Sequence, residues 1–314
     1  MDENEIVNIL CATDNNYISY CGIMLTSVFE TNKHVRVDAY IIIDEPLPKN
    51  EQKRFAKLAT KYNNSIYYLQ IDKSITEKFP VKGSKYWTNA TYYRLYASEM
   101  LPNRVHRVLY FDCDVIVNGK LDNLWQVDMI NKAVGCVYDI FDYNGDNPNR
   151  LNYPIEAGYF NAGVLLINLD YCREHTIWKK YMDILNSDLD LVCNDQDVLN
   201  AALWDKKVQL PITYNFQIQF LKHYFYDKSS PWMQLEIQKT KDNPVVIHYA
   251  SPRKPWNVLY YKMPYKQIWE KYKQISPWRY MLPRLPDYKV TNYIVKRFLL
   301  WPLGLMWQDE YISY

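Results

Sequence analysis

Val108-Leu-Tyr-Phe-Asp112-Cys-Asp114-Val-Ile-Val117 places two carboxylates, one residue apart, inside an otherwise apolar run. Apolar runs of this length are typical of strands that are buried on both faces. We therefore expect a buried strand with the acidic pair near its end. Alternate residues of an extended chain face the same way, so the two side chains could bind one divalent cation, directly or through water.

The Asp-x-Asp triplet is weak evidence by itself. Roughly one or two such triplets arise by chance at this aspartate content, and Asp188/Asp190 and Asp195/Asp197 repeat the pattern. A solvated acidic loop is therefore the alternative interpretation. The apolar flanks and the motifs found elsewhere favour a metal site, and hard oxygen ligands with open positions suit Mg²⁺ or Mn²⁺ that carries a diphosphate.

The composition is that of an ordinary globular protein, with 314 residues of which 48% are hydrophobic and 23% charged. Thirty tyrosines and ten tryptophans suit either surfaces that stack on sugars or bases, or an aromatic-rich core. The start, Met-Asp-Glu-Asn-Glu, lacks the pattern of a signal peptide, and no stretch approaches the roughly 18 apolar residues of a spanning helix. We therefore expect a cytoplasmic protein with reduced cysteines.

The net charge of +2 is unevenly distributed. Residues 253–314 hold 11 Lys and Arg against 4 Asp and Glu, so the C-terminal part is basic and the remainder acidic. Within it, residues 289–307 place three basic residues before an apolar run of about half the length that spans a bilayer. We expect a basic, aromatic appendage over residues 261–314, which either lies on an anionic membrane surface at the inner face or packs back on the domain formed by residues 1–260.

The rest of the chain alternates strands and helices. We expect strands at 6–12, 35–43, 65–71, from 108 to near the acidic pair at 112 and 114, and at 133–137, 159–168 and 244–249. We expect helices at 17–30, 49–62, 88–100 and 198–204. A polar insert at 142–156 is long enough to be a lid or substrate loop. The alternation predicts an α/β fold over residues 1–260, with a mostly parallel sheet and ligands at the carboxyl ends of its strands. There is no Gly-x-Gly-x-x-Gly, so a dinucleotide cofactor is not expected.

Several polar residues in these elements have two interpretations. Arg94, among tyrosines, is either a surface arginine packed on aromatics or a cation that points into a polar cleft. Gly163 would allow close approach of the backbone to a ligand. Asp195 and Asp197 open a predicted helix, where N-capping is the alternative to a role in a site.

His248 has two interpretations of the same kind. It ends a predicted strand, six residues before Lys254. A lone histidine is commonly structural, but a histidine at this position could complete the metal site while Lys254 binds a phosphate.

Six short motifs follow one another along the chain. They are Ala12-Thr-Asp14-Asn-Asn16-Tyr17, Tyr93-Arg94-Leu95, Asp112-Cys-Asp114, Phe160-Asn161-Ala162-Gly163, Asp195-Gln196-Asp197, and His248 with Lys254-Pro-Trp256. Together they resemble the retaining glycosyltransferases of family 8, which include lipopolysaccharide glucosyl- and galactosyltransferases and glycogenin. The resemblance covers about residues 5–256. It implies a GT-A fold, which is Rossmann-like and binds nucleotide sugars, with a UDP-hexose donor and Mn²⁺ or Mg²⁺.

The resemblance also assigns residues to three parts of the donor. The uridine and ribose would lie against Ala12, Asp14, Asn16 and Tyr17. The metal would be bound by Asp112, Asp114 and His248, and the diphosphate would meet Lys254 and Ser251. The hexose would be surrounded by Arg94, Asp139, Asn161, Ala162, Asp195 and Gln196. Ser251 departs from the family's His-x-x-Gly-x-x-Lys-Pro-Trp, which puts one backbone contact to the diphosphate in doubt.

The activity implied is transfer of glucose or galactose from UDP to a saccharide or lipid-linked acceptor, in the synthesis of lipopolysaccharide or another cell-surface glycan. Gln196 is a poor nucleophile, so same-face attack by the acceptor is favoured, with Asp195 as the carboxylate alternative for a double displacement. A nucleic-acid partner is not expected.

Two other functions compete with this one. A catalytically silent, membrane-associated carbohydrate-binding protein would have lost a metal ligand, and all three candidates are present. Haloacid-dehalogenase-like phosphatases also place Asp-x-Asp at a strand end, but normally on the first strand of their catalytic core.

Overall fold

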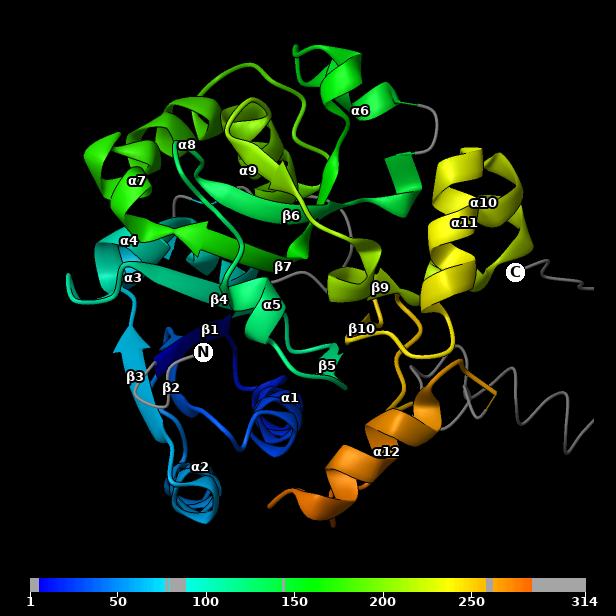
Figure 1. Cartoon of the computed structure of the whole chain (residues 1–314). Helices are drawn as coiled ribbons and strands as arrows, with labels where there is room; N and C mark the ends of the chain where they lie inside the picture. Colours follow the sequence, from blue (N-terminus) through cyan, green and yellow to red (C-terminus); the bar gives the residue numbers. More distant parts are fainter. Residues whose placement is uncertain (1–5, 77–78, 80–88, 143–144, 258–261, 284–314) are drawn as a thin grey trace, which may run out of the picture.

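The computed structural model describes residues 6–76, 79, 89–142, 145–257 and 262–283, with helices packed on both faces of a seven-stranded sheet (Figure 1). The strand order is β3-β2-β1-β4-β7-β6-β8. These strands are β1 (Ile6–Ala12), β2 (Arg36–Ile43), β3 (Ser65–Gln70), β4 (Arg107–Phe111), β6 (Val134–Tyr138), β7 (Phe160–Asn168) and β8 (Lys207–Gln209). Strand β7 runs antiparallel to both neighbours and the other pairings are parallel, which confirms the predicted α/β fold with a mostly parallel sheet.

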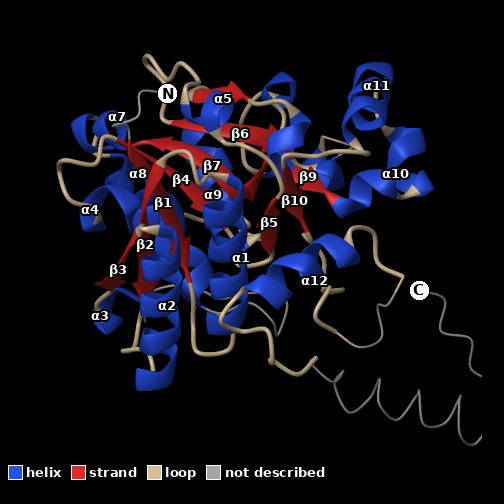
Figure 2. Ribbon diagram, turned by 60° about the horizontal axis from the view of Figure 1, so that its bottom comes forward, coloured by secondary structure: helices blue, strands red, loops and turns tan. Residues whose placement is uncertain are grey.

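A second sheet of three strands lies beside the first, in the order β5-β10-β9. Its strands are β5 (Val115–Val117), β9 (Phe216–Gln217) and β10 (Val246–His248). Helices α10 (His223–Lys228) and α11 (Pro231–Thr240) lie next to this sheet, away from the first helices of the chain (Figures 1 and 2). The second sheet therefore extends the fold on one side of the seven-stranded sheet.

Two apolar layers explain why the central strands read as continuous apolar runs. On one face, α1 (Ile18–Thr31), α2 (Lys49–Tyr62) and α12 (Lys266–Ile275) cover side chains such as Ile9 and Cys11 of β1. On the other face, the layer over Leu10 and Ala12 is formed by the 3₁₀ helix η1 (Asn89–Tyr96) and by α4 (Ala97–Met100), α7 (Leu169–Glu174), α8 (Ile177–Leu185) and α9 (Asn194–Leu203). A strand covered on both faces has no reason to alternate apolar and polar residues.

The remaining elements are short: α3 (Lys73–Thr76), α5 (Asp122–Trp125), α6 (Asp146–Arg150), η2 (Ile140–Asp142), η3 (Ile155–Ala157), η4 (Ile212–Asn215) and η5 (Ile218–Leu221). The predicted helix at 88–100 is in fact η1 followed by α4. The predicted loop at 142–156 contains α6 and η3. Its Arg150 forms two hydrogen bonds of 2.8 Å with the buried carboxylate of Asp197, and this ion pair fixes the insert to the start of α9.

The predicted strand from Val108 ends near its acidic pair, as expected, but the two carboxylates do not lie on one extended strand. Strand β4 ends at Phe111, the Asp112-Cys-Asp114 segment turns with Val115 N donating to Asp112 O at 3.2 Å, and β5 then begins in the other sheet. An apolar run does not reveal this change of sheet, because both strands are buried. The two carboxylates therefore lie together because of a turn, not because alternate residues of one strand share a face.

Part of the predicted C-terminal appendage can be described. Trp269, Tyr272 and Trp278 are buried in the core layer that contains α1, and Trp278 Nε1 donates to Glu51 Oε2 of α2 at 2.7 Å. A Cβ atom on Gly22 of α1 would lie 2.2 Å from Trp278, so glycine is required for this contact. The division of the chain at residue 260 stays a prediction.

The proposed membrane-binding segment, residues 289–307, lies outside the described residues. In the described part of the chain, no helix combines the length and the apolar character needed to cross a membrane.

Candidate active site

The reversed direction of β7 assembles the site. Its first residues, Asn161 to Gly163, lie at the carboxyl ends of β4 and β6, because β7 is antiparallel to both strands. Asp112 follows β4 and its N–H donates to Gly163 O at 2.9 Å, while Asp139 follows β6 and its N–H donates to Tyr159 O at 3.0 Å. Polar residues from three separate stretches of sequence therefore meet at one edge of the sheet, as expected for ligand sites in α/β folds.

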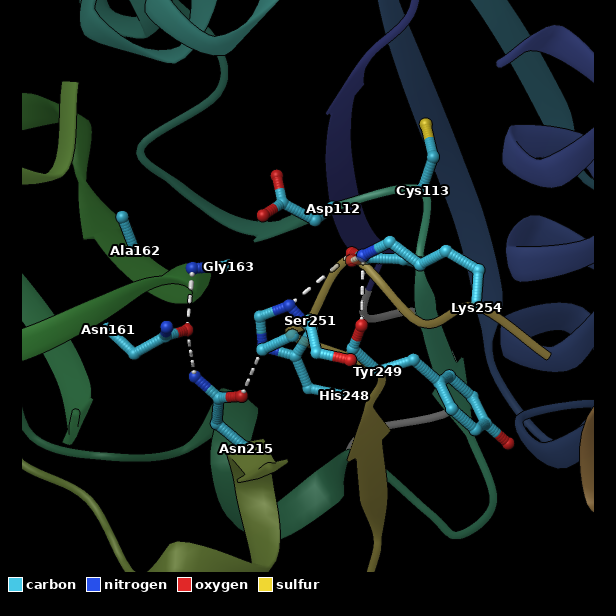
Figure 3. Close-up of polar contacts among 12 residues, drawn as sticks. Asp112, Cys113, Asn161, Ala162, Gly163, Asn215, His248, Tyr249, Ser251 and Lys254 are labelled. Atoms are coloured by element: carbon cyan, nitrogen blue, oxygen red, sulfur yellow. Dashed lines mark hydrogen bonds and ion pairs between the residues drawn. The ribbon is translucent and has the colours of Figure 1, made fainter. Parts of the chain in front are cut away.

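Asp112, Asp114 and His248 form a group whose ligand atoms all lie within 4.8 Å of one another. We call this group the acid–histidine cluster (Figure 3). Strand β10 carries His248 to the turn because it pairs with β5, with Tyr249 N donating to Asp114 O at 3.0 Å. Two carboxylates and an imidazole that converge in this way are a donor set suited to Mn²⁺ or Mg²⁺.

Gly163 permits this convergence. A Cβ atom there would lie 2.2 Å from His248 Cε1 and 2.9 Å from Asp112 Oδ2. Any side chain at this position would displace both ligands. The close approach observed at Gly163 is to side chains of the acid–histidine cluster, and the expected approach of this backbone to a ligand stays a prediction.

Lysine 254 neutralises part of the cluster's negative charge. Lys254 Nζ forms a short ion pair with Asp114 Oδ2 and donates to Tyr249 O at 2.9 Å. Burial would raise the pKa of Asp114, but Lys254 and His248 outweigh burial and hold that pKa below the ordinary value of an aspartate. Asp114 is therefore ionised near neutral pH and available to a cation.

Arg94 is buried and joins the two carboxylates on either side of it. Its Nη2 donates to Asp112 Oδ1 at 2.7 Å, its Nη1 donates to Ala162 O, and its guanidinium lies 4.3 Å from the centre of the Tyr110 ring. Burial would lower the pKa of Arg94, but Asp112 and Asp195 raise it, so the side chain stays charged. The interpretation of Arg94 as a surface arginine is wrong.

Asp195 lies on the other side of Arg94, in the first turn of α9. Its Oδ2 is 3.0 Å from Arg94 Nε, but that N–H is directed to Thr91 O, and Asp195 Oδ2 has no hydrogen-bond partner in the described structure. Burial raises the pKa of Asp195 to about 7, although Arg94 lowers it. Neither Asp195 nor Asp197 is the N-cap residue, which is Cys193. Asp197 Oδ2 nevertheless accepts from Val192 N and Cys193 N at 2.7 Å, so this carboxylate does bind backbone N–H groups at the start of α9.

Asp139, Asn161 and Gln196 form a second group, which we call the amide cluster. Gln196 Nε2 donates to Asp139 Oδ2 at 2.7 Å, Asn161 Nδ2 donates to the same oxygen at 3.2 Å, and Gln196 Oε1 accepts from Ala162 N at 2.9 Å. Burial raises the pKa of Asp139, while hydrogen bonds from Phe141 N, Asn161 and Gln196 lower it. The amide of Gln196 is thus held at both of its polar atoms.

Two cavities open over these groups and share Arg94, Asp112 and Asn161. The first, of about 420 Å³, contains the acid–histidine cluster and the residues Ala12, Asp14, Tyr17, Ser251 and Lys254. The second, of about 280 Å³, contains the amide cluster together with Ala162 and Asp195. Of the residues predicted for the site, Asn16 lines neither cavity. It is exposed, and its N–H donates to Asp14 Oδ1 at 2.8 Å.

Sequence reasoning missed three side chains at the site. Tyr110 Oη donates to Asp112 Oδ1 at 2.9 Å, Phe141 lines both cavities, and Asn215 contacts His248. A signal for Asn215 exists in the sequence, because Asn215, Gln217 and Gln219 alternate with apolar residues, and all three are fully buried. Buried amides at a period of two indicate a polar face directed into the protein.

Comparison with known proteins gives a consistent result. The model of glycosyl transferase family 8 matches residues 8–259. A lipopolysaccharide 1,2-glucosyltransferase of Escherichia coli (strain K12) is 30% identical over 323 residues, covering 100% of this chain and 89% of that protein. General stress protein A of Bacillus subtilis (strain 168) is 27% identical over 282 residues, covering 88% of this chain and 96% of that protein.

A solved structure of the galactosyltransferase LgtC, in complex with donor and acceptor sugar analogues, is similar at a TM-score of 0.75 and 22% identity, over 91% of this chain and 99% of that chain. This likeness confirms the predicted GT-A fold.

Proposed function

The chain belongs to glycosyl transferase family 8, and from this premise we propose that it transfers glucose or galactose from the UDP-sugar to a saccharide acceptor. One observation carries the proposal: the two cavities join at Arg94, Asp112 and Asn161, with the acid–histidine cluster in one and the amide cluster in the other. A nucleotide diphosphate and a hexose are two linked groups of about these sizes. The phosphatase interpretation has no support in this family.

In the proposed complex, Asp112, Asp114 and His248 hold Mn²⁺ or Mg²⁺, which neutralises the charge that grows on the leaving diphosphate. Lys254 would stabilise the same negative charge on the diphosphate, since its ammonium lies beside Asp114 and can turn toward a phosphate oxygen. Ala12, Asp14 and Tyr17 line the part of the first cavity that we assign to the uridine and ribose.

The amide cluster, with Arg94, Ala162 and Asp195, is proposed to surround the hexose. Both polar ends of the Gln196 amide are hydrogen-bonded, so this side chain can orient the sugar but is a poor nucleophile. We therefore propose that the acceptor attacks from the face that UDP leaves, and that the anomeric configuration is retained. Asp195 is the carboxylate that a double displacement would use instead.

The decisive experiment screens UDP-glucose, UDP-galactose and their N-acetyl forms for UDP release, with Mn²⁺ and with a chelator. We expect release from one of the hexoses, and we expect it to require the metal. Turnover that is undiminished by the chelator would contradict the metal site. Donor binding without any release of UDP would instead favour a catalytically silent carbohydrate-binding protein.

Stereochemistry is tested on the transferred product. Proton NMR of the new linkage should show the α configuration of the donor. A β linkage would contradict retention, and a glycosyl adduct trapped on Asp195 would contradict same-face attack.

Lipopolysaccharide or another lipid-linked glycan is the proposed acceptor class, because several relatives act on lipopolysaccharide according to their names. The basic segment 289–307 would bring the enzyme to such an acceptor at an anionic membrane surface, a proposal that rests on sequence alone. Deletion of residues 285–314 should abolish co-sedimentation with anionic liposomes and spare donor hydrolysis. Unchanged sedimentation would contradict membrane docking.

A further inference from the structure

A chain of buried hydrogen bonds connects the acid–histidine cluster to the amide cluster through Asn215. His248 Nδ1 lies 2.9 Å from Asn215 Oδ1, and Asn215 Nδ2 donates to Asn161 Oδ1 at 2.9 Å (Figure 3). Asn215 is fully buried and His248 is 3% exposed, so neither side chain can exchange these partners for bulk water. The contact also depends on the second sheet, where β9 begins directly after Asn215 and pairs with β10.

A backbone group determines which atoms donate and which accept in this chain of hydrogen bonds. Gly163 N–H can only donate, and it donates to Asn161 Oδ1 at 3.0 Å. This atom is therefore the amide oxygen, and Asn215 must present its Nδ2 to it. The remaining polar atom of Asn215 is an oxygen that can only accept, so His248 Nδ1 carries the proton of that hydrogen bond.

The hydrogen bond at Nδ1 determines what the other ring nitrogen of His248, Nε2, can offer to a ligand. A neutral imidazole that is protonated on Nδ1 has its free lone pair on Nε2. His248 Nε2 lies 3.3 Å from Asp114 Oδ1, within the acid–histidine cluster. That tautomer offers a lone pair, rather than an N–H, to a cation shared with Asp112 and Asp114.

We infer that Asn215 is a positioning residue: it holds His248 in the tautomer and ring orientation that a divalent cation requires, and its other end holds Asn161 in the amide cluster. The inference rests on the proposed metal site. It is independent of the identity of the hexose and of the acceptor. A partner on the second ring nitrogen of a metal-binding histidine typically changes metal affinity by about 10–100-fold.

Two substitutions separate the two ends of Asn215. Asn215→Ala removes both the acceptor for His248 and the donor for Asn161. Asn215→Asp keeps an acceptor for His248 but cannot donate to Asn161. Asn32→Ala is the matched control, because Asn32 is also buried and its side chain forms three hydrogen bonds outside both cavities, from Leu121 N and to Val28 O and Thr31 Oγ1.

Mn²⁺ binding to the full chain without nucleotide is measured by calorimetry, and folding by the melting temperature. We expect the Kd for Mn²⁺ to rise about 10–100-fold in Asn215→Ala and to stay within about threefold of the parent in Asn215→Asp and Asn32→Ala. Hydrolysis of the UDP-sugar should still fall about tenfold in Asn215→Asp, because Asn161 Oδ1 has lost one of its two donors and keeps only Gly163 N.

A parent-like Kd in folded Asn215→Ala would overturn the inference. Equal loss of affinity in both Asn215 variants would also overturn it, because the aspartate retains the acceptor. If Asn215→Ala does not fold, the Asn215→Asp comparison and the tautomer of His248 decide the question.

The tautomer is read from ¹⁵N NMR of the metal-free parent labelled at histidine, with His248 assigned by its loss in His248→Ala. A proton on Nδ1, alone or together with one on Nε2, supports the inference, and a ring protonated on Nε2 alone overturns it. The two experiments test the two proposals separately. A parent that binds no Mn²⁺ in calorimetry contradicts the metal site of the proposed function. The tautomer of His248, read by NMR without metal, still tests the role of Asn215 in that case.

Discussion

The acid–histidine cluster and the amide cluster lie at the same edge of the sheet but are built on different principles. In the first, charges oppose one another: Asp114 pairs with Lys254, and Asp112 pairs with Arg94. In the second, Asp139, Asn161 and Gln196 are joined by hydrogen bonds to neutral amides, and burial raises the pKa of Asp139. Ion pairs therefore hold the acid–histidine cluster together, whereas hydrogen bonds to neutral amides hold the amide cluster together.

This difference predicts how each end responds to the donor. A cation that binds Asp114 shares this carboxylate with Lys254, which holds Oδ2, while Oδ1 faces His248 Nε2 at 3.3 Å. Metal and diphosphate therefore add charge beside an ion pair that is already formed. The amide cluster already satisfies Gln196 and Asp139 internally, so it can receive a sugar with little movement. Substitutions in the first cluster should therefore remove most of the activity, and substitutions in the second should reduce it by smaller factors.

The largest effect is expected for Asp114→Asn. The substitution removes a proposed metal ligand and the partner of Lys254, so Mn²⁺-dependent UDP release should fall on the order of a thousandfold. Asp122→Asn is the control, because Asp122 also contacts a histidine, His34, outside both cavities. Initial rates and melting temperatures are compared for both variants. Full activity in folded Asp114→Asn would remove the distinction between the two clusters.

Gln196→Ala should have a smaller effect. It loses the hydrogen bonds to Asp139 and Ala162 N, which position the sugar in our proposal, but it removes neither a charge nor a nucleophile. We expect kcat to fall a few tens of fold, with the affinity for Mn²⁺ unchanged. The control is Gln234→Ala, since the side chain of Gln234 on α11 donates to Tyr226 O of α10 and to Ser229 O. A loss as large as that of Asp114→Asn would mean that Gln196 takes part in the bond-making step.

The sequence predicts the two clusters unequally well. The pattern of apolar residues predicts the first and last residues of β1 and α2 correctly. A strand covered on both faces and an amphipathic helix have distinct patterns. The candidate ligands Asp112 and Asp114 are evident as an acidic pair in an apolar run. The turn between them is not, because no local pattern marks the point where a strand leaves one sheet for another.

Asn215 shows the same limit more clearly. The alternation of amides and apolar residues around Asn215 indicates a buried amide, but its partner, His248, is 33 positions away in the sequence. The contact with His248 follows from the register of β9 and β10, which a single sequence does not specify. Local chemistry is therefore readable in this chain, whereas pairings between distant segments require the structure.

Asp195 allows a test of burial at the boundary between the clusters. Its pKa is raised to about 7 by burial, from an ordinary value of 3.8. A carboxyl raised in this way contributes stability that is fully present below the unfolded pKa and is lost as pH rises through the folded pKa. The parent should therefore lose stability between pH 5 and pH 8 relative to Asp195→Asn, by about 2–3 kcal/mol.

Urea unfolding of both proteins at pH 5 and pH 8, in the presence of a chelator, measures this difference. Asp188→Asn serves as control, since Asp188 is an exposed carboxylate shortly before α9. A stability difference that does not change with pH would show that Asp195 is ionised throughout, held by Arg94 despite its burial.

The smallest effect is expected at Phe141, which lies at the mouth of both cavities and belongs to neither cluster. Its ring is 47% exposed and packs edge-on against Phe225, with ring centroids 5.2 Å apart. An exposed aromatic ring beside a sugar cavity can stack on an incoming saccharide, a contact worth about 1 kcal/mol. Phe141→Ala should therefore raise the KM for a simple glycoside acceptor, such as methyl β-galactoside, about three- to fivefold, and leave hydrolysis of the UDP-sugar unchanged. Ile130→Ala, at another exposed apolar side chain, controls for surface effects. Equal losses of hydrolysis and transfer in Phe141→Ala would instead assign the ring to the donor side, because a residue that contacts only the acceptor cannot alter the reaction with water.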